Sequence, residues 1–69
     1  MHMFLRQAGV LLLKSLVLRV DQHKQGPLWD ILLPLKEDIL ILIKDCLKDN
    51  EPQVTWLASE VLQIMSWWP

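Results

Sequence analysis

The side chains that could do chemistry are few, and they do not form a recognised reactive set. His2, His23 and Cys46 are the strongest candidates for metal ligands. Their spacing matches neither Cys-x-x-Cys nor His-x-x-x-His, the patterns in which near neighbours reach one ion. Cys46 is the single cysteine, so we expect a packed thiol in a reducing compartment. The sequence predicts no metal and no cofactor.

Carboxylates are more numerous, but they do not suggest catalysis. Those within residues 37–51 are Glu37, Asp38, Asp45, Asp49 and Glu51. At helical spacing most of them share a solvated face with Lys44 and Lys48, as surface charges do. The chain has no glycine-rich phosphate loop, no nucleophile elbow and no catalytic Ser, His and Asp set. We therefore expect a non-enzymatic protein without catalytic residues and without a small-molecule substrate.

The composition favours a small helical unit that associates with other chains. The 69 residues are 52% hydrophobic and 22% charged, and they are expected to form one domain over residues 1–69. A chain of this length buries only about 60% of the surface that its unfolded form exposes. Because neither a disulfide nor a metal is expected, association is the remaining way to add stability.

The charge balance gives little reason to expect a polyanion or a membrane as partner. Seven Lys and Arg against eight Asp and Glu leave a net charge of −1. The apolar runs 9–13 and 39–43 are far shorter than the roughly 18 residues of a membrane span. The basic residues near the end of the first helical segment, which could touch phosphate or form only a solvated rim, are Lys14, Arg19, His23 and Lys24. We expect an intracellular protein, cytoplasmic or nuclear.

Helical periodicity predicts an all-α fold of three antiparallel helices, at about 3–21, 28–48 and 52–67. Pro34 lies inside the second segment, so either a kinked continuous helix or a separate turn before the proline fits, and we favour the kink. Gly26 can take a positive φ before Pro27. In the next turn Asn50 is the expected N-cap of the third helix, with Gln53 completing a capping box.

The first and third predicted helices each have an apolar face that is expected to be core. The predicted core faces are Leu5, Gly9, Leu12, Leu13, Leu16 and Val20 in the first helix, and Val54, Leu57, Ala58, Val61, Leu62 and Met65 in the third. A second stripe of the first helix holds Phe4, Leu11 and Leu18. It is either a seam for a partner helix or a face that packs on a preceding repeat.

The outer face of the third helix carries the remaining interface candidates. They are Trp56, Glu60, Gln63 and Trp67. Rigid aromatic side chains often dominate binding energy. The alternative is that Trp67 and Trp68 cover the open end of the bundle from within the chain, with their indole nitrogens in water.

One stretch resembles a HEAT repeat. The residues that carry the resemblance are Leu32 to Leu35, Ile39 to Val54, Leu57-Ala58 and Val61-Leu62. The family usually places an arginine directly after the valine that opens its second helix, bonded to the aspartate of the turn. Thr55 occupies that position here, so the usual partner of Asp49 is absent. The first helix also matches the third at an offset of about 50 residues, with Ala8 matching Ala58, Leu11 matching Val61 and Leu12 matching Leu62.

The resemblance implies about one and a half units of a HEAT or armadillo-like repeat, a helical hairpin plus one extra helix. Each repeat buries its apolar face against its neighbours. The implied function is a protein–protein interaction scaffold whose partner is another, helical protein or an adjoining repeat. The alternatives are a self-associating bundle that forms a homodimer and, with less support, a phosphate or nucleic-acid contact.

Overall fold

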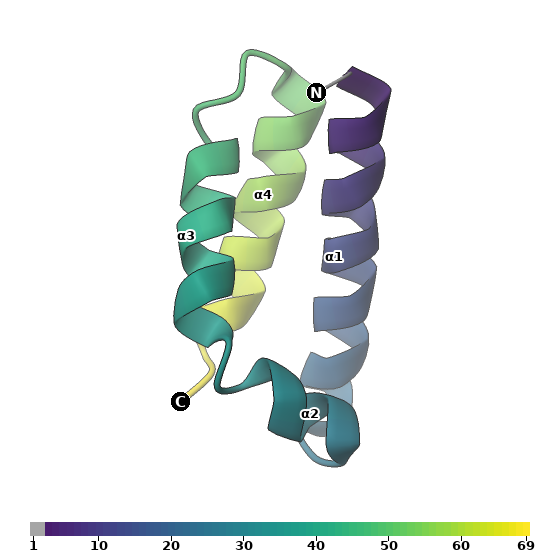
Figure 1. Cartoon of the computed structure of the whole chain (residues 1–69), viewed down its shortest axis with the longest axis vertical. Helices are drawn as coiled ribbons and strands as arrows, with labels where there is room; N and C mark the ends of the chain where they lie inside the picture. The colour runs from purple at the N-terminus through teal and green to yellow at the C-terminus, as the bar shows by residue number, and fades with distance from the viewer. Residues whose placement is uncertain (1–2) are drawn as a thin grey trace.

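The computed structural model is all-α, and it describes residues 3–69, with side chains from Leu5 onward. Its helices are α1 (Met3–His23), α2 (Pro27–Leu32), α3 (Lys36–Cys46) and α4 (Pro52–Met65). Helices α1 and α4 run in the same direction, and α3 runs opposite to both (Figure 1). Helix α4 packs against α1 and α3, and α2 closes one end of α1. The chain is therefore organised around α4.

The connection between α1 and α2 follows the expected local chemistry. Gly26 has a φ of 92° and Pro27 is the first residue of α2. Lys24, which also has a positive φ of 50°, donates its backbone N–H to the Val20 carbonyl at 2.9 Å and so ends α1. The prediction for Gly26 and Pro27 is confirmed, because only glycine takes such a φ without a Cβ penalty.

The prediction of one kinked helix over 28–48 is wrong. Helix α2 ends at Leu32, and α3 begins at Lys36. Pro34 has no N–H to donate, and its ring clashes with the carbonyl four residues earlier. The chain instead forms tighter bonds from the Leu35 N–H to the Leu32 carbonyl and from the Lys36 N–H to the Leu33 carbonyl. Residues 3–69 therefore form four helices where three were predicted.

The cap predicted at the start of the last helix is also wrong. The residue before α4 is Glu51, which makes no side-chain cap bond. Asp49, rather than Asn50, shapes the turn, because its Oδ1 accepts the Glu51 N–H at 2.9 Å. Pro52 does lie in the first turn of α4. The helix ends at Met65, two residues before the predicted end.

The core of α4 is the one predicted, whereas the predicted core face of α1 is confirmed only at Val20 and, in part, at Leu13. On α4 the buried residues are Val54, Leu57, Ala58, Val61 and Met65, with Leu62 partly buried. On α1 the buried residues are Val10, Val17 and Val20, with Leu13 partly buried. Leu5, Leu12 and Leu16, which were predicted to be core, are exposed. Apolar residues surround α1 almost completely, so periodicity alone does not select its buried side.

Polar contacts between distant residues accompany this orientation of α1, in which the valines rather than the predicted leucines face α4. Arg6 bonds Asp49, and Lys14 pairs with Glu60. Further along, the Asp21 carboxylate accepts the Trp68 indole N–H at 2.8 Å. These three residues of α1 each pair with a partner at least 43 positions away in the sequence. They hold the valine face against α4 and leave Leu5, Leu12 and Leu16 outside.

Candidate interaction surface

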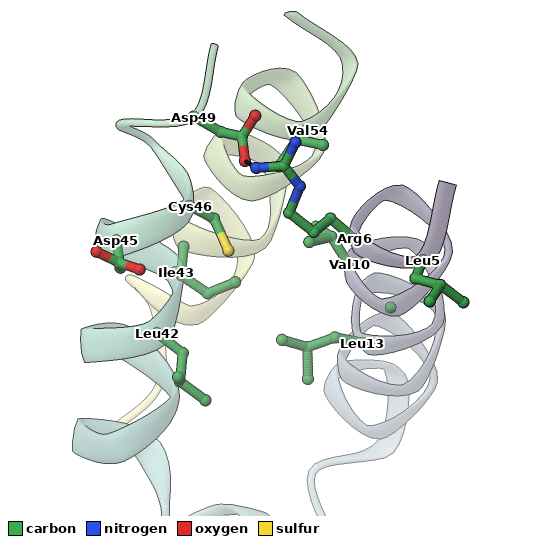
Figure 2. A pocket seen from close by; sticks show the side chains of 11 residues that line it. Leu5, Arg6, Val10, Leu13, Leu42, Ile43, Asp45, Cys46, Asp49 and Val54 are labelled. Atoms are coloured by element: carbon green, nitrogen blue, oxygen red, sulfur yellow. Dashed lines mark hydrogen bonds and ion pairs between the residues drawn. The ribbon is translucent and has the colours of Figure 1, made fainter. Parts of the chain in front are cut away.

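An apolar groove lies between α1 and α3, on the side of the molecule where these two helices do not pack on each other. Leu13 of α1 and Leu42 of α3 point toward one another across it, and the Cys46 sulfur points into it (Figure 2). Its volume is about 380 Å³. The other residues that line it are Leu5, Arg6, Gly9, Val10, Ile43, Asp45, Asp49 and Val54. A groove of this size and composition fits side chains of an apolar ligand or helix.

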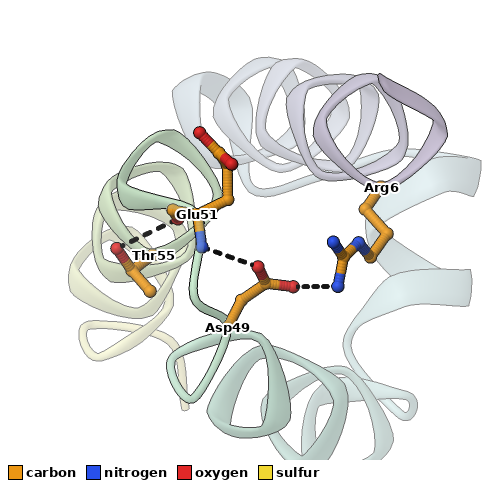
Figure 3. A network of polar contacts seen from close by, with 4 residues as sticks. All are labelled: Arg6, Asp49, Glu51 and Thr55. Atoms are coloured by element: carbon orange, nitrogen blue, oxygen red, sulfur yellow. Dashed lines mark hydrogen bonds and ion pairs between the residues drawn. The ribbon is translucent and has the colours of Figure 1, made fainter. Parts of the chain in front are cut away.

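One end of the groove is closed by a small polar network (Figure 3). Arg6 Nη1 donates to Asp49 Oδ2 at 2.8 Å, and Asp49 Oδ1 accepts the Glu51 N–H. The Asp49 side chain is only 8% exposed, against 39% for Arg6. Arg6 therefore supplies the cation that Thr55 cannot, but it does so from a different helix. Among residues 3–69, Arg6 Nε is buried and finds no acceptor.

Cys46 is a packed thiol in this groove rather than a reactive one. Burial raises the pKa of Cys46, and the nearby Asp45 and Asp49 carboxylates raise it further, while Arg6 opposes them. The thiolate is the nucleophilic form, so a raised pKa leaves the side chain protonated and unreactive at neutral pH. The groove thus offers a surface for binding rather than a nucleophile.

Beside the groove, α1 presents a row of residues that we call the α1 ridge: Leu5, Gly9, Leu12 and Leu16. The three leucines are 63%, 72% and 36% exposed. The four residues of the ridge follow one another at spacings of four, three and four, so they form one continuous stripe. Sequence reasoning missed this surface because it placed these residues in the core. The run of uncharged residues from Gln7 to Leu13 is the signal that could have indicated a second apolar face on this helix.

The predicted stripe on the other side of α1 is exposed in its described part. Leu11 is 49% and Leu18 is 42% exposed. The Phe4 side chain lies outside the described residues. None of these residues lines the groove in the part of the chain that the structure describes. The stripe remains an interface candidate, separate from the α1 ridge.

The predicted face of the last helix is divided rather than continuous. Trp56 is 60% exposed, and the Lys14 ammonium lies 5.3 Å from its ring centroid while it also pairs with Glu60. Trp67, 80% exposed, follows the end of α4 beside Gln63 in a second, smaller pocket of about 290 Å³. Intramolecular contacts therefore already use Glu60 and one face of Trp56.

Trp68 closes the end of the bundle. It is buried, packs edge-to-face on Trp29 with ring centroids 4.9 Å apart, and donates its indole N–H to Asp21. Its backbone carbonyl accepts a bond from Lys36 Nζ at 2.8 Å. Intramolecular packing was the alternative considered for the terminal pair. Trp68 makes that packing, although its indole N–H bonds Asp21 where water was predicted, and Trp67 does not.

Two of the four residues of the basic rim are neutralised within the chain. Lys14 pairs with Glu60, and Lys24 Nζ lies 3.8 Å from Asp21 Oδ1. Arg19 and His23 make no ion pair within residues 3–69. Phosphate binding needs several unpaired cations, so this surface offers little for it.

No family model, no curated protein and no solved structure matches the chain. Within residues 3–69, no helix is long and apolar enough to cross a bilayer. The same residues contain no cluster of three His, Cys, Asp or Glu side chains that could hold a metal ion. The surface geometry is thus the basis for a functional assignment.

Proposed function

We propose that this chain is a protein–protein interaction module that binds a helical surface of another protein through α1. The observation that carries the proposal is the exposure of the α1 ridge beside an apolar groove. From Ala8 to Leu18 the only charged residue of α1 is Lys14, and it is occupied by Glu60. A helix that is apolar on nearly all sides is normally buried on nearly all sides.

The match between α1 and α4 supports a helical-repeat origin for the chain. Ala58 and Val61 of α4 are completely buried. Their counterparts at the offset of 50, Ala8 and Leu11, are exposed on α1. A partner or adjoining repeat that covered α1 as its neighbours cover α4 would bury these positions. This is the arrangement that a HEAT or armadillo-like unit requires.

The groove supports binding rather than catalysis. Its polar groups are Arg6 and Asp49, which are bonded to each other, with the Asp45 carboxylate on its edge. Its thiol has a raised pKa. A general acid or base must reach a substrate with a proton to exchange, and Arg6 and Asp49 are committed to the turn. We infer a scaffold role without an enzymatic step.

Site-specific photocrosslinking in cells tests the proposal. A photoreactive residue replaces Leu12 on the α1 ridge, and the matched control replaces Ile41, which is 64% exposed on α3 and does not line the groove. We expect a discrete crosslinked protein from position 12 and none from position 41. The complex is then rebuilt from purified chains, where Leu12→Glu should weaken binding at least about tenfold. Equal crosslinking from both positions, or none from position 12, contradicts the proposal.

A further inference from the structure

The α1 ridge and the groove lie next to each other on the same side of the molecule. Leu5 and Gly9 belong to both, since they also line the groove. A groove needs a ridge as its complement, and the ridge that stands beside this groove has the leucine spacing of a helix-pairing seam. The surface therefore carries both the ridge and the groove that it would fit, which is the condition for two copies of the chain to pair through a two-fold axis.

Geometry selects one kind of two-fold axis. An axis perpendicular to the helices would place ridge against ridge and groove against groove, which leaves both grooves empty. An axis parallel to the helices places the ridge of each copy in the groove of the other. The two α1 helices then run in the same direction, and each also touches α3 of the opposite copy. Gly9, where an added Cβ would meet no atom within 4 Å, lets the helices approach closely.

Charges on the two helices fit this parallel arrangement. The groove edge of α3, which we call the α3 rim, holds Leu35, Asp38, Leu42 and Asp45 at spacings of three, four and three. Arg19 continues the α1 ridge three residues after Leu16. Arg6 is level with Asp49, to which it bonds, and α3 runs opposite to α1. Thirteen residues further along α1, Arg19 is therefore level with the first turn of α3, where Asp38 lies.

Both of these charged residues are available. Arg19 and Asp38 are exposed, and neither makes an ion pair within residues 3–69. Because the parallel axis keeps each residue at its own level, Arg19 of one copy lies opposite Asp38 of the other, and the pair forms twice. Charge pairs of this kind fix register and direction more than they add affinity.

We propose that the groove is occupied by a second copy of this chain, in a parallel two-fold dimer with α1 against α1. The dimer deepens the proposed function and rests on it, since it names the partner of the same surface. The Cα atoms of the whole molecule span 34 by 17 Å along its two longest axes, so each copy can bury an area on the order of 600 Å² if most of this face is used. Stable interfaces bury a total of about 1,200 to 2,000 Å², so the dimer is at the small end of that range.

Sedimentation equilibrium of the purified chain, from about 1 μM to about 1 mM, provides the first test. We expect a reversible monomer–dimer equilibrium, which Leu12→Glu shifts toward monomer by at least about tenfold while circular dichroism shows the helices intact. Ile41→Glu, at a similarly exposed position away from the groove, should leave the equilibrium unchanged. A folded monomer at the highest concentration overturns the inference, and so does a dimer that Leu12→Glu leaves intact.

Charge exchange tests the register without removing an apolar side chain. Arg19→Asp and Asp38→Arg should each weaken dimerisation several-fold, and the double variant should restore it. Glu37→Arg is the matched control, because it makes the same change in the same first turn of α3. Weakening by Glu37→Arg equal to that by Asp38→Arg, or no recovery in the double variant, contradicts the assigned pair.

Disulfide trapping tests whether the two α1 helices of the dimer run in the same direction. In a Cys46→Ser background under air oxidation, Leu5→Cys and Gly9→Cys should each link two copies, because both residues belong to the ridge and to the groove and a parallel axis keeps each at the level of its own counterpart. Linking at position 9 but not at position 5 would mean antiparallel helices and overturn the parallel arrangement. If the chain is monomeric but the photocrosslink at position 12 joins another protein, the dimer is refuted and the proposed function stands. If neither is found, both fail.

Discussion

Helices α1 and α4 run side by side in the same direction, yet the chain buries very different shares of their apolar surfaces. Helix α4 has one main apolar face, and the bundle buries nearly all of it. Helix α1 has apolar residues on most of its circumference, and the bundle buries its valines and part of Leu13. The difference shows that a helix packed between two others can be satisfied within the chain, whereas an outer helix that is apolar on most sides leaves apolar surface exposed.

The largest expected effect separates the removal of a buried side chain of α4 from the removal of an exposed side chain of α1. Met65, which is completely buried, should lose about 2–5 kcal/mol of unfolding free energy on Met65→Ala. Leu12→Ala should change it by less than about 0.5 kcal/mol. Urea denaturation is measured in solutions dilute enough to be monomeric. Comparable losses at both positions would mean that α1 buries its ridge within the chain.

A smaller loss is expected where α1 is tied to the turn before α4. Asp49→Ala removes the acceptor for Arg6 and for the Glu51 N–H. We expect a loss of about 1–2 kcal/mol, because the Asp49 carboxylate is nearly buried whereas Arg6 can still reach water. Asp45→Ala, an exposed carboxylate nearby, is the control and should stay within about 0.5 kcal/mol. The two denaturation midpoints distinguish a structural ion pair from a surface charge.

A gain is expected on the uncovered side of α1. Gly9 is inside a long helix, and its added Cβ would meet nothing. Gly9→Ala should therefore raise the unfolding free energy of the dilute monomer by about 0.5–1 kcal/mol, because alanine loses less conformational entropy in a helix. Thermal unfolding followed by circular dichroism measures the gain. A destabilised monomer would show that the space beside Gly9 is filled within the chain.

The smallest effect concerns Cys46, where α1, α3 and α4 meet. The pKa of Cys46 is raised in the folded chain, so the folded state keeps its proton at pH values where the unfolded thiol has lost it. The corresponding stability is present below the ordinary thiol pKa and is lost as the pH rises through and above it. Urea midpoints from about pH 7.5 to about pH 10 should fall more steeply for the native chain than for Cys46→Ser. Parallel profiles would contradict the raised pKa.

The sequence predicted α4 well because its single apolar face leaves one way to pack. It could not predict the rotation of α1, where leucines and valines compete for the same side and the deciding contacts join Arg6 to Asp49 and Lys14 to Glu60. These residues are distant in the sequence, and nothing local indicates that they meet. The α1 ridge was found as a stripe but was assigned to the core for the same reason.

Local chemistry also left two outcomes undecided. A proline inside a helical segment permits a kink or a break, and the break at Pro34 depends on how α2 packs against α1. In the turn before α4, Asp49 and Asn50 can both accept a backbone N–H, and only the approach of Arg6 favours the aspartate. Such choices follow from tertiary contacts rather than from propensity.

The edge-to-face pair of Trp29 and Trp68 gives the chain an optical signal of its own. Two indoles at 4.9 Å are close enough for their excited states to couple, whereas the exposed Trp56 and Trp67 report mainly on the solvent around them. Near-ultraviolet circular dichroism should therefore follow the packing of α2 against the end of the bundle. The wavelength of tryptophan fluorescence should follow the solvent exposure of Trp56 and Trp67. The assembly of this small bundle can be watched at both kinds of site without a label.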